Sequence, residues 1–168
     1  MASTGFTHEA PVMGKTNIWL TPPALLSELG EFDLDPCAAP APRPWATAKR
    51  HYDITQGQDG LVLPLEGSVF CNPPYGPEAV AWLRKCAEHG DAVALIFART
   101  ETRAFVQQVW RKADAVLFLA GRLKFCRPDG TPGASAAAPS VLVAYGFDAK
   151  ERLYLPGLPG QIVTWEKP

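Results

Sequence analysis

Short apolar runs alternate along the chain with segments whose apolar residues recur every three or four positions. The runs at residues 92–97, 115–119 and 141–147 carry no charged residue, which is typical of strands buried on both faces of a sheet. Residues 78–88 and 101–112 carry apolar side chains at helical spacing. Strands that alternate with crossover helices predict an α/β domain whose mostly parallel sheet is covered on both faces.

Two further predicted strands end at polar residues. Polar and apolar residues alternate over 31–35, which predicts a strand that the following proline terminates. Residues 68–71 predict a second strand, which stops at Asn72. Residues 38–66 between them are rich in Pro and Gly and leave room for one short strand near 51–54. The sheet is therefore expected to be abbreviated.

A short helix is predicted to begin near residue 21. Thr21 suits the N-cap position, because its side-chain oxygen can accept a hydrogen bond from a backbone N–H. Pro22 suits the first helical position, where its missing N–H costs nothing, and Gly30 can end the helix.

The composition predicts one globular domain. Of the 168 residues, 47% are hydrophobic and 20% are charged, so a packed core is expected over residues 17–168, preceded by a flexible N-terminus at 1–16. No apolar run approaches the ~20 residues of a membrane span. The first residues lack the basic and apolar parts of a secretory signal. We therefore expect a protein of the cytoplasm, or of the host cytoplasm if a phage encodes it.

The cysteines give no sign of a metal centre. They stand singly, with no C-x-x-C pair, which predicts neither a zinc site nor a disulfide framework. They are Cys37, Cys71, Cys86 and Cys126.

The most informative segment is residues 71–76, Cys-Asn-Pro-Pro-Tyr-Gly, at the end of a predicted buried strand. Ligands of open α/β sheets bind at the carboxyl ends of strands. The prolines supply no N–H and hold the preceding backbone extended, so the Asn72 amide oxygen and the Pro73 carbonyl can both project outward as acceptors. Tyr75 offers a ring on which a base can stack. The alternative interpretation is a plain proline turn after a core strand.

Two acceptors suit an amino group on an aromatic ring. The lone pair of the adenine amine is delocalised into the ring, which makes the nitrogen a poor nucleophile. Acceptors that bind both of its hydrogens draw the nitrogen toward tetrahedral geometry, an interaction favoured most in the transition state. Methyl transfer from a sulfonium then needs in-line placement and no nucleophilic Ser or Cys.

Five segments in this order resemble the phage-type, Dam-like DNA N6-adenine methyltransferases, over roughly residues 17–147. They are residues 19–23, 32–38, 59–61, 69–76 and 121–125. The resemblance implies a single-domain, Rossmann-like methyltransferase sheet, S-adenosylmethionine as methyl donor and double-stranded DNA as substrate. No obligatory protein partner is evident.

Carried over by position, the resemblance assigns the target adenine to Asn72, Pro73, Pro74 and Tyr75. It assigns the donor to other residues, each of which also has a plain structural interpretation. These are Thr21 and Pro22, alternatively a helix cap; Asp35 and Pro36, alternatively a strand-ending turn; and Asp59, alternatively a D-G turn.

The chain departs from the family pattern in two places. Residues 37–40 (Cys-Ala-Ala-Pro) stand where methyltransferases usually have a Gly-x-Gly loop, although small residues still permit close backbone approach. Residues 51–55 (His-Tyr-Asp-Ile-Thr) stand where the family tends to show His-Phe-Thr, and within residues 40–58 the resemblance offers Asp53 as a ligand of the donor ribose.

DNA contact is predicted for residues 121–140. The net charge of −1 argues against a purely electrostatic nucleic-acid binder, but this segment begins with Arg122, Lys124 and Arg127 and continues through a Gly- and Pro-rich tip. We expect it to contact phosphates or a groove beside a flipped base. The alternative is a solvated surface loop.

The sequence thus predicts an adenine-specific DNA methyltransferase that acts by direct transfer. A protein glutamine N5-methyltransferase is a rival, because an amide nitrogen poses the same chemical problem. Those enzymes usually add a helical substrate domain and a glycine-rich donor loop. A non-catalytic nucleic-acid-binding module with a methyltransferase fold is the other alternative.

Overall fold

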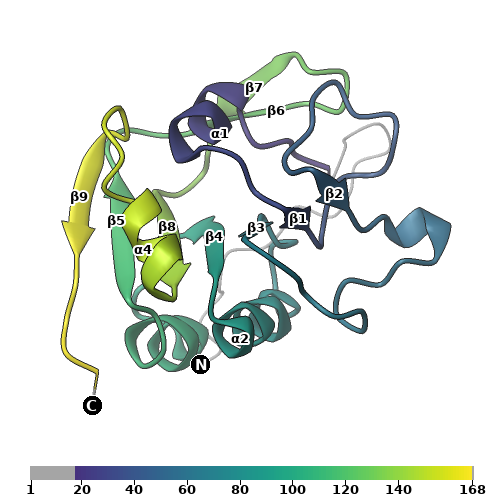
Figure 1. The fold of residues 1–168 in the computed structure, drawn as a ribbon. Helices are drawn as coiled ribbons and strands as arrows, with labels where there is room; N and C mark the ends of the chain where they lie inside the picture. The colour runs from purple at the N-terminus through teal and green to yellow at the C-terminus, as the bar shows by residue number, and fades with distance from the viewer. Residues whose placement is uncertain (1–17, 168) are drawn as a thin grey trace, which may run out of the picture.

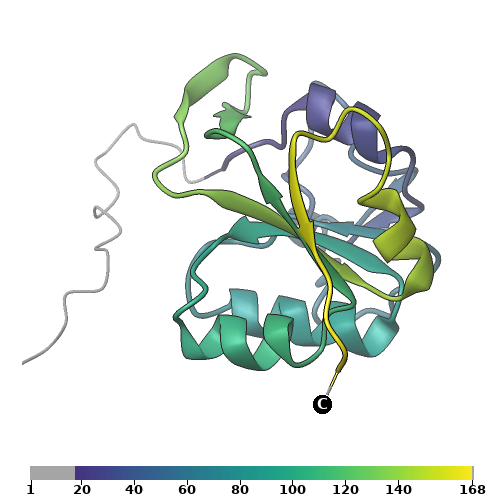
Figure 2. The ribbon, with the colours of Figure 1, turned by 90° about the vertical axis from the view of Figure 1, so that its left-hand side faces the viewer.

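The computed structural model describes residues 18–167, which form three layers (Figure 2). A central sheet carries helices on both faces, as the alternation of strands and helices predicted. The predicted flexible segment, residues 1–16, lies outside the described residues. One face carries α1 (Pro23–Leu29) and α4 (Phe147–Arg152), and the other carries α2 (Ala79–His89) and the continuous helical segment of α3 (Arg103–Phe105) and η2 (Val106–Trp110).

The sheet has seven strands in the order β2-β1-β3-β4-β8-β5-β9 (Figure 1). The first four strands in this order pair in parallel, whereas β8 pairs antiparallel with both of its neighbours, and β9 pairs antiparallel with β5. The strands are β1 (Leu34–Asp35), β2 (Arg50–His51), β3 (Val69–Cys71), β4 (Ala92–Phe97), β5 (Ala115–Leu119), β8 (Ser140–Tyr145) and β9 (Gly160–Val163).

The expectation of a mostly parallel sheet is wrong for the half that contains β8 and β9. A parallel connection between adjacent strands needs a crossover, and the chain between β5 and β8 has no helix to make one. The segment predicted as a loop, residues 121–140, instead holds a two-stranded hairpin of β6 (Lys124–Cys126) and β7 (Pro132–Ser135). The last predicted strand also ends earlier, at Tyr145, because Phe147 begins α4.

The N-terminal helix begins one residue later than predicted. Pro22 occupies the N-cap position and Pro23 the first helical position, and no side chain caps the helix. The Thr21 hydroxyl is therefore not a helix cap, and its hydrogen bond goes elsewhere. Within residues 38–66 the short strand predicted near 51–54 lies earlier, as β2 at residues 50–51, and a single 3-10 turn, η1 (Ile54–Gln56), occupies the end of the predicted range.

The period-two alternation of β4 divides the core between the two faces of the sheet. Val93 and Leu95 pack with Leu29 of α1, whereas Ala94 and Ile96 pack with Leu83 of α2. These residues are buried at 9% exposure or less. Each crossover helix is thereby fixed to one face of the sheet.

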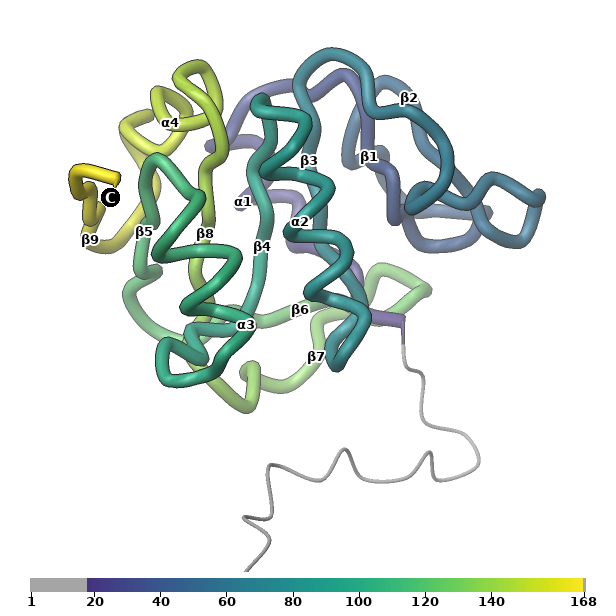
Figure 3. The backbone as a smooth tube through the Cα atoms, turned by 90° about the horizontal axis from the view of Figure 1, so that it is seen from below, coloured from purple at the N-terminus to yellow at the C-terminus, as the bar shows by residue number. Residues whose placement is uncertain are grey.

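The carboxyl ends of β1, β3, β4 and β5 lie at one edge of the sheet, because β5 runs in the same direction as the parallel strands. The β6–β7 hairpin follows β5 and lies at this same edge (Figures 1 and 3). Among residues 18–167, no helix is long and apolar enough to cross a membrane.

Candidate active site

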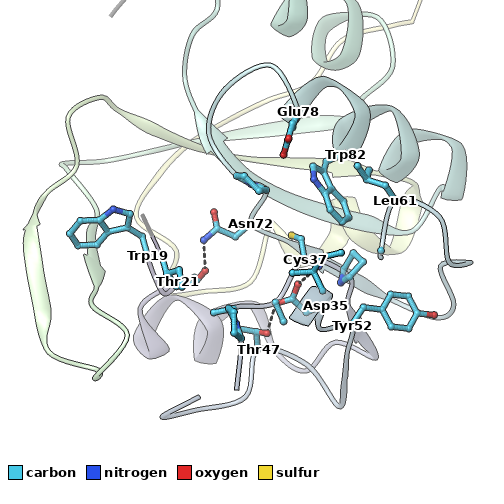
Figure 4. Close-up of a pocket in the computed structure, with 18 of the residues that line it drawn as sticks. Trp19, Thr21, Asp35, Cys37, Thr47, Tyr52, Leu61, Asn72, Glu78 and Trp82 are labelled. Carbon is cyan, nitrogen blue, oxygen red and sulfur yellow. Dashed lines mark hydrogen bonds between the residues drawn. The ribbon is translucent and has the colours of Figure 1, made fainter. Parts of the chain in front are cut away.

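A cavity of about 960 Å³ opens where β1 and β3 end (Figure 4). This is near the upper end of the volumes of small-molecule sites. The lining comes from segments far apart in the sequence: the strand-like residues 18–21, the loop after β1, the segment around 52–61, and the loop after β3 with the start of α2. The sheet edge therefore gathers the segments that the sequence singled out.

Asn72 lies directly after β3 and lines this cavity half-buried. Its amide nitrogen donates a hydrogen bond to the Thr21 hydroxyl oxygen at 3.1 Å, and Figure 4 shows the amide oxygen turned away from Thr21. Among residues 18–167, no group donates to this oxygen. Asn72 therefore keeps a free acceptor at the cavity.

The two prolines after Asn72 differ in their exposure. Pro73 is buried and does not contribute to the cavity lining, whereas Pro74 is exposed and does. Within the described chain, no backbone or side-chain donor reaches the Pro73 carbonyl oxygen. Among the described residues, the segment thus has two acceptors without internal partners, of which only the one on Asn72 belongs to a cavity-lining residue.

Tyr75 is held by aromatic packing rather than by its hydroxyl. Its ring stacks on Phe97 of β4 with 4.3 Å between centroids and 9° between planes, and it meets Phe125 of β6 edge-on at 6.3 Å and 84°. The hydroxyl is buried and has no hydrogen-bond partner among residues 18–167, and burial raises the pKa of Tyr75 above its usual range. Neither ring contact could be predicted from the sequence, because both join distant segments.

Asp35 ends β1 and is almost completely buried, at 3% exposure. One carboxylate oxygen accepts a hydrogen bond from the Cys37 N–H at 3.0 Å, and the other accepts from the Thr47 hydroxyl at 2.5 Å. Burial raises the pKa of Asp35 to about 6, and the hydrogen bonds from Thr47 and Cys37 oppose this shift. The carboxylate is fixed in place at the cavity wall.

Asp59 lies in the predicted D-G turn and lines the cavity. Its carboxylate accepts a hydrogen bond from the Leu61 N–H at 2.9 Å. The turn packs so closely on the loop after β1 that a Cβ at Gly60 would lie 1.9 Å from the Pro36 carbonyl oxygen. Only glycine fits there, which joins the two loops that carry Asp35 and Asp59.

Lys85 of α2 fastens the same turn from the protein side. Its ammonium donates hydrogen bonds to the carbonyl oxygens of Gly60, at 2.7 Å, and Leu63. Desolvation lowers the pKa of Lys85. This role of Lys85 was not predicted from the sequence, because a lysine on an amphipathic helix carries no local signal of a contact 25 residues away.

Two residues predicted to bind the donor lie elsewhere. Asp53 is buried and is not among the cavity-lining residues. Its carboxylate accepts hydrogen bonds from the Thr55 N–H, the Thr55 hydroxyl and the Ala41 N–H. One carboxylate oxygen of Asp53 lies 3.5 Å from a guanidinium nitrogen of Arg43. Pro22 lines a separate groove of about 380 Å³ beside the hairpin. Thr21, Asp35, Pro36 and Asp59 do line the main cavity.

The rest of the cavity is apolar and acidic. Tyr52, Leu61 and Trp82 gather at the end away from Asn72 (Figure 4). The Asp, Glu, Lys, Arg and His side chains of the lining, within the described chain, are three carboxyl groups and one guanidinium: Asp35, Asp59, Glu78 and Arg43. A ligand with a flat ring and positive charge fits these residues.

The hairpin brings the predicted basic residues to the edge of the sheet that holds the cavity. Arg122 donates to the Ala136 carbonyl at 3.2 Å and Arg127 to the Pro132 carbonyl at 2.7 Å, so both guanidinium groups brace the hairpin. Lys124 is exposed, and no described residue pairs with its ammonium. The hairpin is tied to the cavity wall by reciprocal backbone hydrogen bonds between Leu20 and Cys126, at 2.8 and 2.9 Å.

Comparison with known protein families places the chain in one of them. The model of the family described as DNA N-6-adenine-methyltransferase (Dam) matches residues 11–152. No curated protein and no solved structure matches the chain.

Proposed function

Since the chain belongs to the DNA N-6-adenine-methyltransferase (Dam) family and is an adenine-specific DNA methyltransferase, we propose that it takes its methyl group from S-adenosylmethionine. We further propose that it methylates an adenine flipped out of the duplex, by direct transfer. The observation that carries the proposal is the free amide oxygen of Asn72 in a cavity of about 960 Å³. A buried base cannot reach such a site while it remains stacked, which favours base flipping.

The adenine amino group would bind between Asn72 and Pro73. Its two hydrogens match two acceptors, the Asn72 amide oxygen and the Pro73 carbonyl oxygen. Both hydrogen bonds strengthen as the nitrogen becomes tetrahedral, so they lower the barrier more than they tighten ground-state binding. As the N–C bond forms at this nitrogen, the bond between the methyl carbon and the sulfonium sulfur would break and leave a neutral thioether, and the nitrogen would then release one of its two protons to water. Pro74 and Tyr75 would form the wall against which the base lies.

The donor would occupy the end of the cavity away from Asn72. S-adenosylmethionine supplies a methyl group on a positively charged sulfur, together with an adenosine and an amino-acid end. The carboxylates of Asp35 and Asp59 suit the positive groups, and Tyr52, Leu61 and Trp82 suit the flat ring. Both oxygens of Asp35 still have lone pairs that can accept a hydrogen bond from a ligand. Pro36 and Gly60 keep the two loops in contact.

The fold supports the same proposal. Four parallel strands with helices on both faces, and a cavity at their carboxyl ends, are the arrangement in which Rossmann-like sheets bind nucleotide-containing ligands. The short β2 and the single turn η1 take the place of longer β-α units. We infer an abbreviated Rossmann-like methyltransferase sheet.

Duplex DNA would lie across the β6–β7 hairpin. Lys124 presents an unpaired ammonium, and Arg122 and Arg127 present guanidinium groups whose bonds to hairpin carbonyls leave other N–H donors free. These charges suit phosphates, which position a protein on DNA. The hairpin would therefore hold the duplex while the flipped base enters the cavity.

Transfer of labelled methyl groups from S-adenosylmethionine tests the proposal. The acceptors are unmethylated duplex DNA, RNA and a mixture of proteins, each with the parent protein and with Asn72→Ala. We expect label in N6-methyladenine of DNA with the parent, and far slower labelling with Asn72→Ala. Label in protein glutamine would favour the rival enzyme, and an absence of donor binding by calorimetry would favour a non-catalytic module.

A further inference from the structure

Thr21 makes a contact that neither a helix cap nor a donor ligand requires. Its hydroxyl oxygen accepts the hydrogen bond of the Asn72 amide nitrogen at 3.1 Å, although the two residues are 51 positions apart. Thr21 is 2% exposed. The hydroxyl is therefore a fixed internal partner of the Asn72 side chain.

The backbone around Thr21 is anchored on both sides. Leu20 exchanges two backbone hydrogen bonds with Cys126 of β6, and the Thr21 carbonyl accepts from the Trp45 ring nitrogen at 3.1 Å. Residue 21 thus cannot move without breaking contacts with the hairpin and with the loop after β1. The hydroxyl is held where it meets the amide.

An asparagine side chain can turn its nitrogen or its oxygen toward a ligand. Methyl transfer to an amino group needs the oxygen on the cavity side, which places the nitrogen on the protein side. There the nitrogen needs an acceptor, because a half-buried N–H without a partner costs free energy. Thr21 supplies that acceptor in the orientation the structure shows (Figure 4).

We propose that Thr21 is a positioning residue for Asn72, which holds the amide oxygen toward the target adenine, rather than a ligand of the methyl donor. The proposal rests on the proposed function, because the orientation matters only if Asn72 binds an amino group. It differs from the role that the family resemblance implies, which places Thr21 on the donor.

The test compares three substitutions of Thr21. Thr21→Val removes the hydroxyl and keeps the shape, Thr21→Ser keeps the hydroxyl, and Thr21→Cys matches serine in shape but accepts hydrogen bonds poorly. Thr164→Val, at an exposed position outside the cavity lining, is the matched control. Each variant is measured for kcat with labelled donor and duplex DNA at saturation, for donor affinity by calorimetry, and for folding by thermal unfolding.

We expect Thr21→Val and Thr21→Cys to lower kcat about tenfold or more, since a wrongly oriented amide loses one transition-state hydrogen bond. The affinity for the methyl donor should stay within about twofold of the parent's, because none of the substitutions removes a contact with the methyl donor. Thr21→Ser should keep kcat within about threefold. In the Asn72→Ala background, Thr21→Val should have no further effect on kcat, which a general loss of folding would not reproduce.

A kcat of Thr21→Val equal to the parent's overturns the proposal. The proposal also fails if Thr21→Val lowers kcat as much in the Asn72→Ala background as it does in the parent. A loss of donor affinity at unchanged kcat assigns Thr21 to the donor instead. If Thr21→Val does not fold, the ratio of kcat between Thr21→Ser and Thr21→Cys tests the proposal instead. A ratio near one overturns the proposal. If the parent protein labels no DNA, the proposed function itself fails.

Discussion

The two ends of the cavity use polar side chains in opposite ways. Asp35 ends β1 and Asn72 follows β3, so both stand at the same edge of the sheet. The two oxygens of Asp35 already accept hydrogen bonds from Thr47 and Cys37. The amide oxygen of Asn72 accepts none from the described residues.

This difference separates support from chemistry. A buried side chain whose acceptors are filled by its own loop first fixes that loop, and it acts on a ligand through the position it keeps. A side chain with an empty acceptor at a cavity wall can take a ligand hydrogen directly. Changes near Asp35 should therefore appear in stability and donor affinity, and changes near Asn72 in the rate of transfer.

Asp35→Asn should give the largest change in stability. Because burial raises the pKa of Asp35 to about 6 from 3.8, the folded state binds this proton more tightly than the unfolded chain. The stabilisation is full below pH about 4 and is lost as the pH rises to about 6, a difference of about 3 kcal/mol at about 1.4 kcal/mol per pKa unit. Urea unfolding from pH 3 to 8 should show this decline in the parent and not in the variant.

Asp33→Asn is the matched control for the sign of that effect. Asp33 accepts hydrogen bonds from the Ser68 N–H, Lys49 and the Ser68 hydroxyl, and these lower its pKa to about 2 from 3.8. Its contribution is present above pH about 4 and is lost as the pH falls toward 2. The two variants should therefore shift the stability curve in opposite directions, and equal shifts would contradict the assignment.

Lys85→Met should weaken donor binding about tenfold, because the variant loses the two charge-assisted hydrogen bonds that hold the turn of Asp59. At saturating donor, kcat should change little, since no group at Asn72 is disturbed. The measurement is KM for the donor against kcat. Lys150→Met on α4 serves as the control, and a fall in kcat alone would argue against a purely supporting role.

Lys124→Ala should affect DNA and leave the donor untouched. Loss of one phosphate contact should reduce the slope of log Kd against log salt concentration by about one and weaken binding at every DNA sequence alike. Titration of duplex DNA at several salt concentrations measures this slope. Arg127→Ala should also loosen the hairpin, because it removes the bond to Pro132. An unchanged slope in Lys124→Ala would show that the DNA binds another surface of the protein.

Tyr75→Phe should have the smallest effect. The hydroxyl is buried and no described residue bonds to it, so its removal should raise the free energy of unfolding by up to about 1 kcal/mol. The ring contacts with Phe97 and Phe125 do not need it, and kcat should stay within about twofold. A large fall in kcat would show that the hydroxyl, rather than the ring, takes part.

The sequence predicted the strands more reliably than their directions. The apolar runs at β4 and β5 were confirmed with their bounds, because a strand buried on both faces leaves an unbroken pattern. Nothing in the pattern of β8 says that it runs backwards. Direction depends on the chain between β5 and β8, where the missing helix was the available signal. The exposed edge strand β9 carries no apolar run and was missed.

The site was predictable as far as its residues are neighbours in the sequence. Asn72, Pro73, Pro74 and Tyr75 form one local segment, of which all but Pro73 line the cavity. The residues that support the site are far from their partners in the sequence. Lys85 is 25 positions from Gly60, and Thr21 is 51 positions from Asn72. Such contacts exist only once the sheet has brought the segments together, so no local pattern encodes them.

The reversed strand β8 also makes the hairpin an exchangeable part. Neighbouring antiparallel strands need only a tight turn between them, so residues 120–139 exceed what the connection from β5 to β8 requires. The tip between β6 and β7 is exposed, while Phe125 and Cys126 hold the base of the hairpin against Tyr75 and Leu20. A chimaeric protein with a foreign tip grafted between these anchors would keep the catalytic framework, and its choice of DNA could be reprogrammed independently.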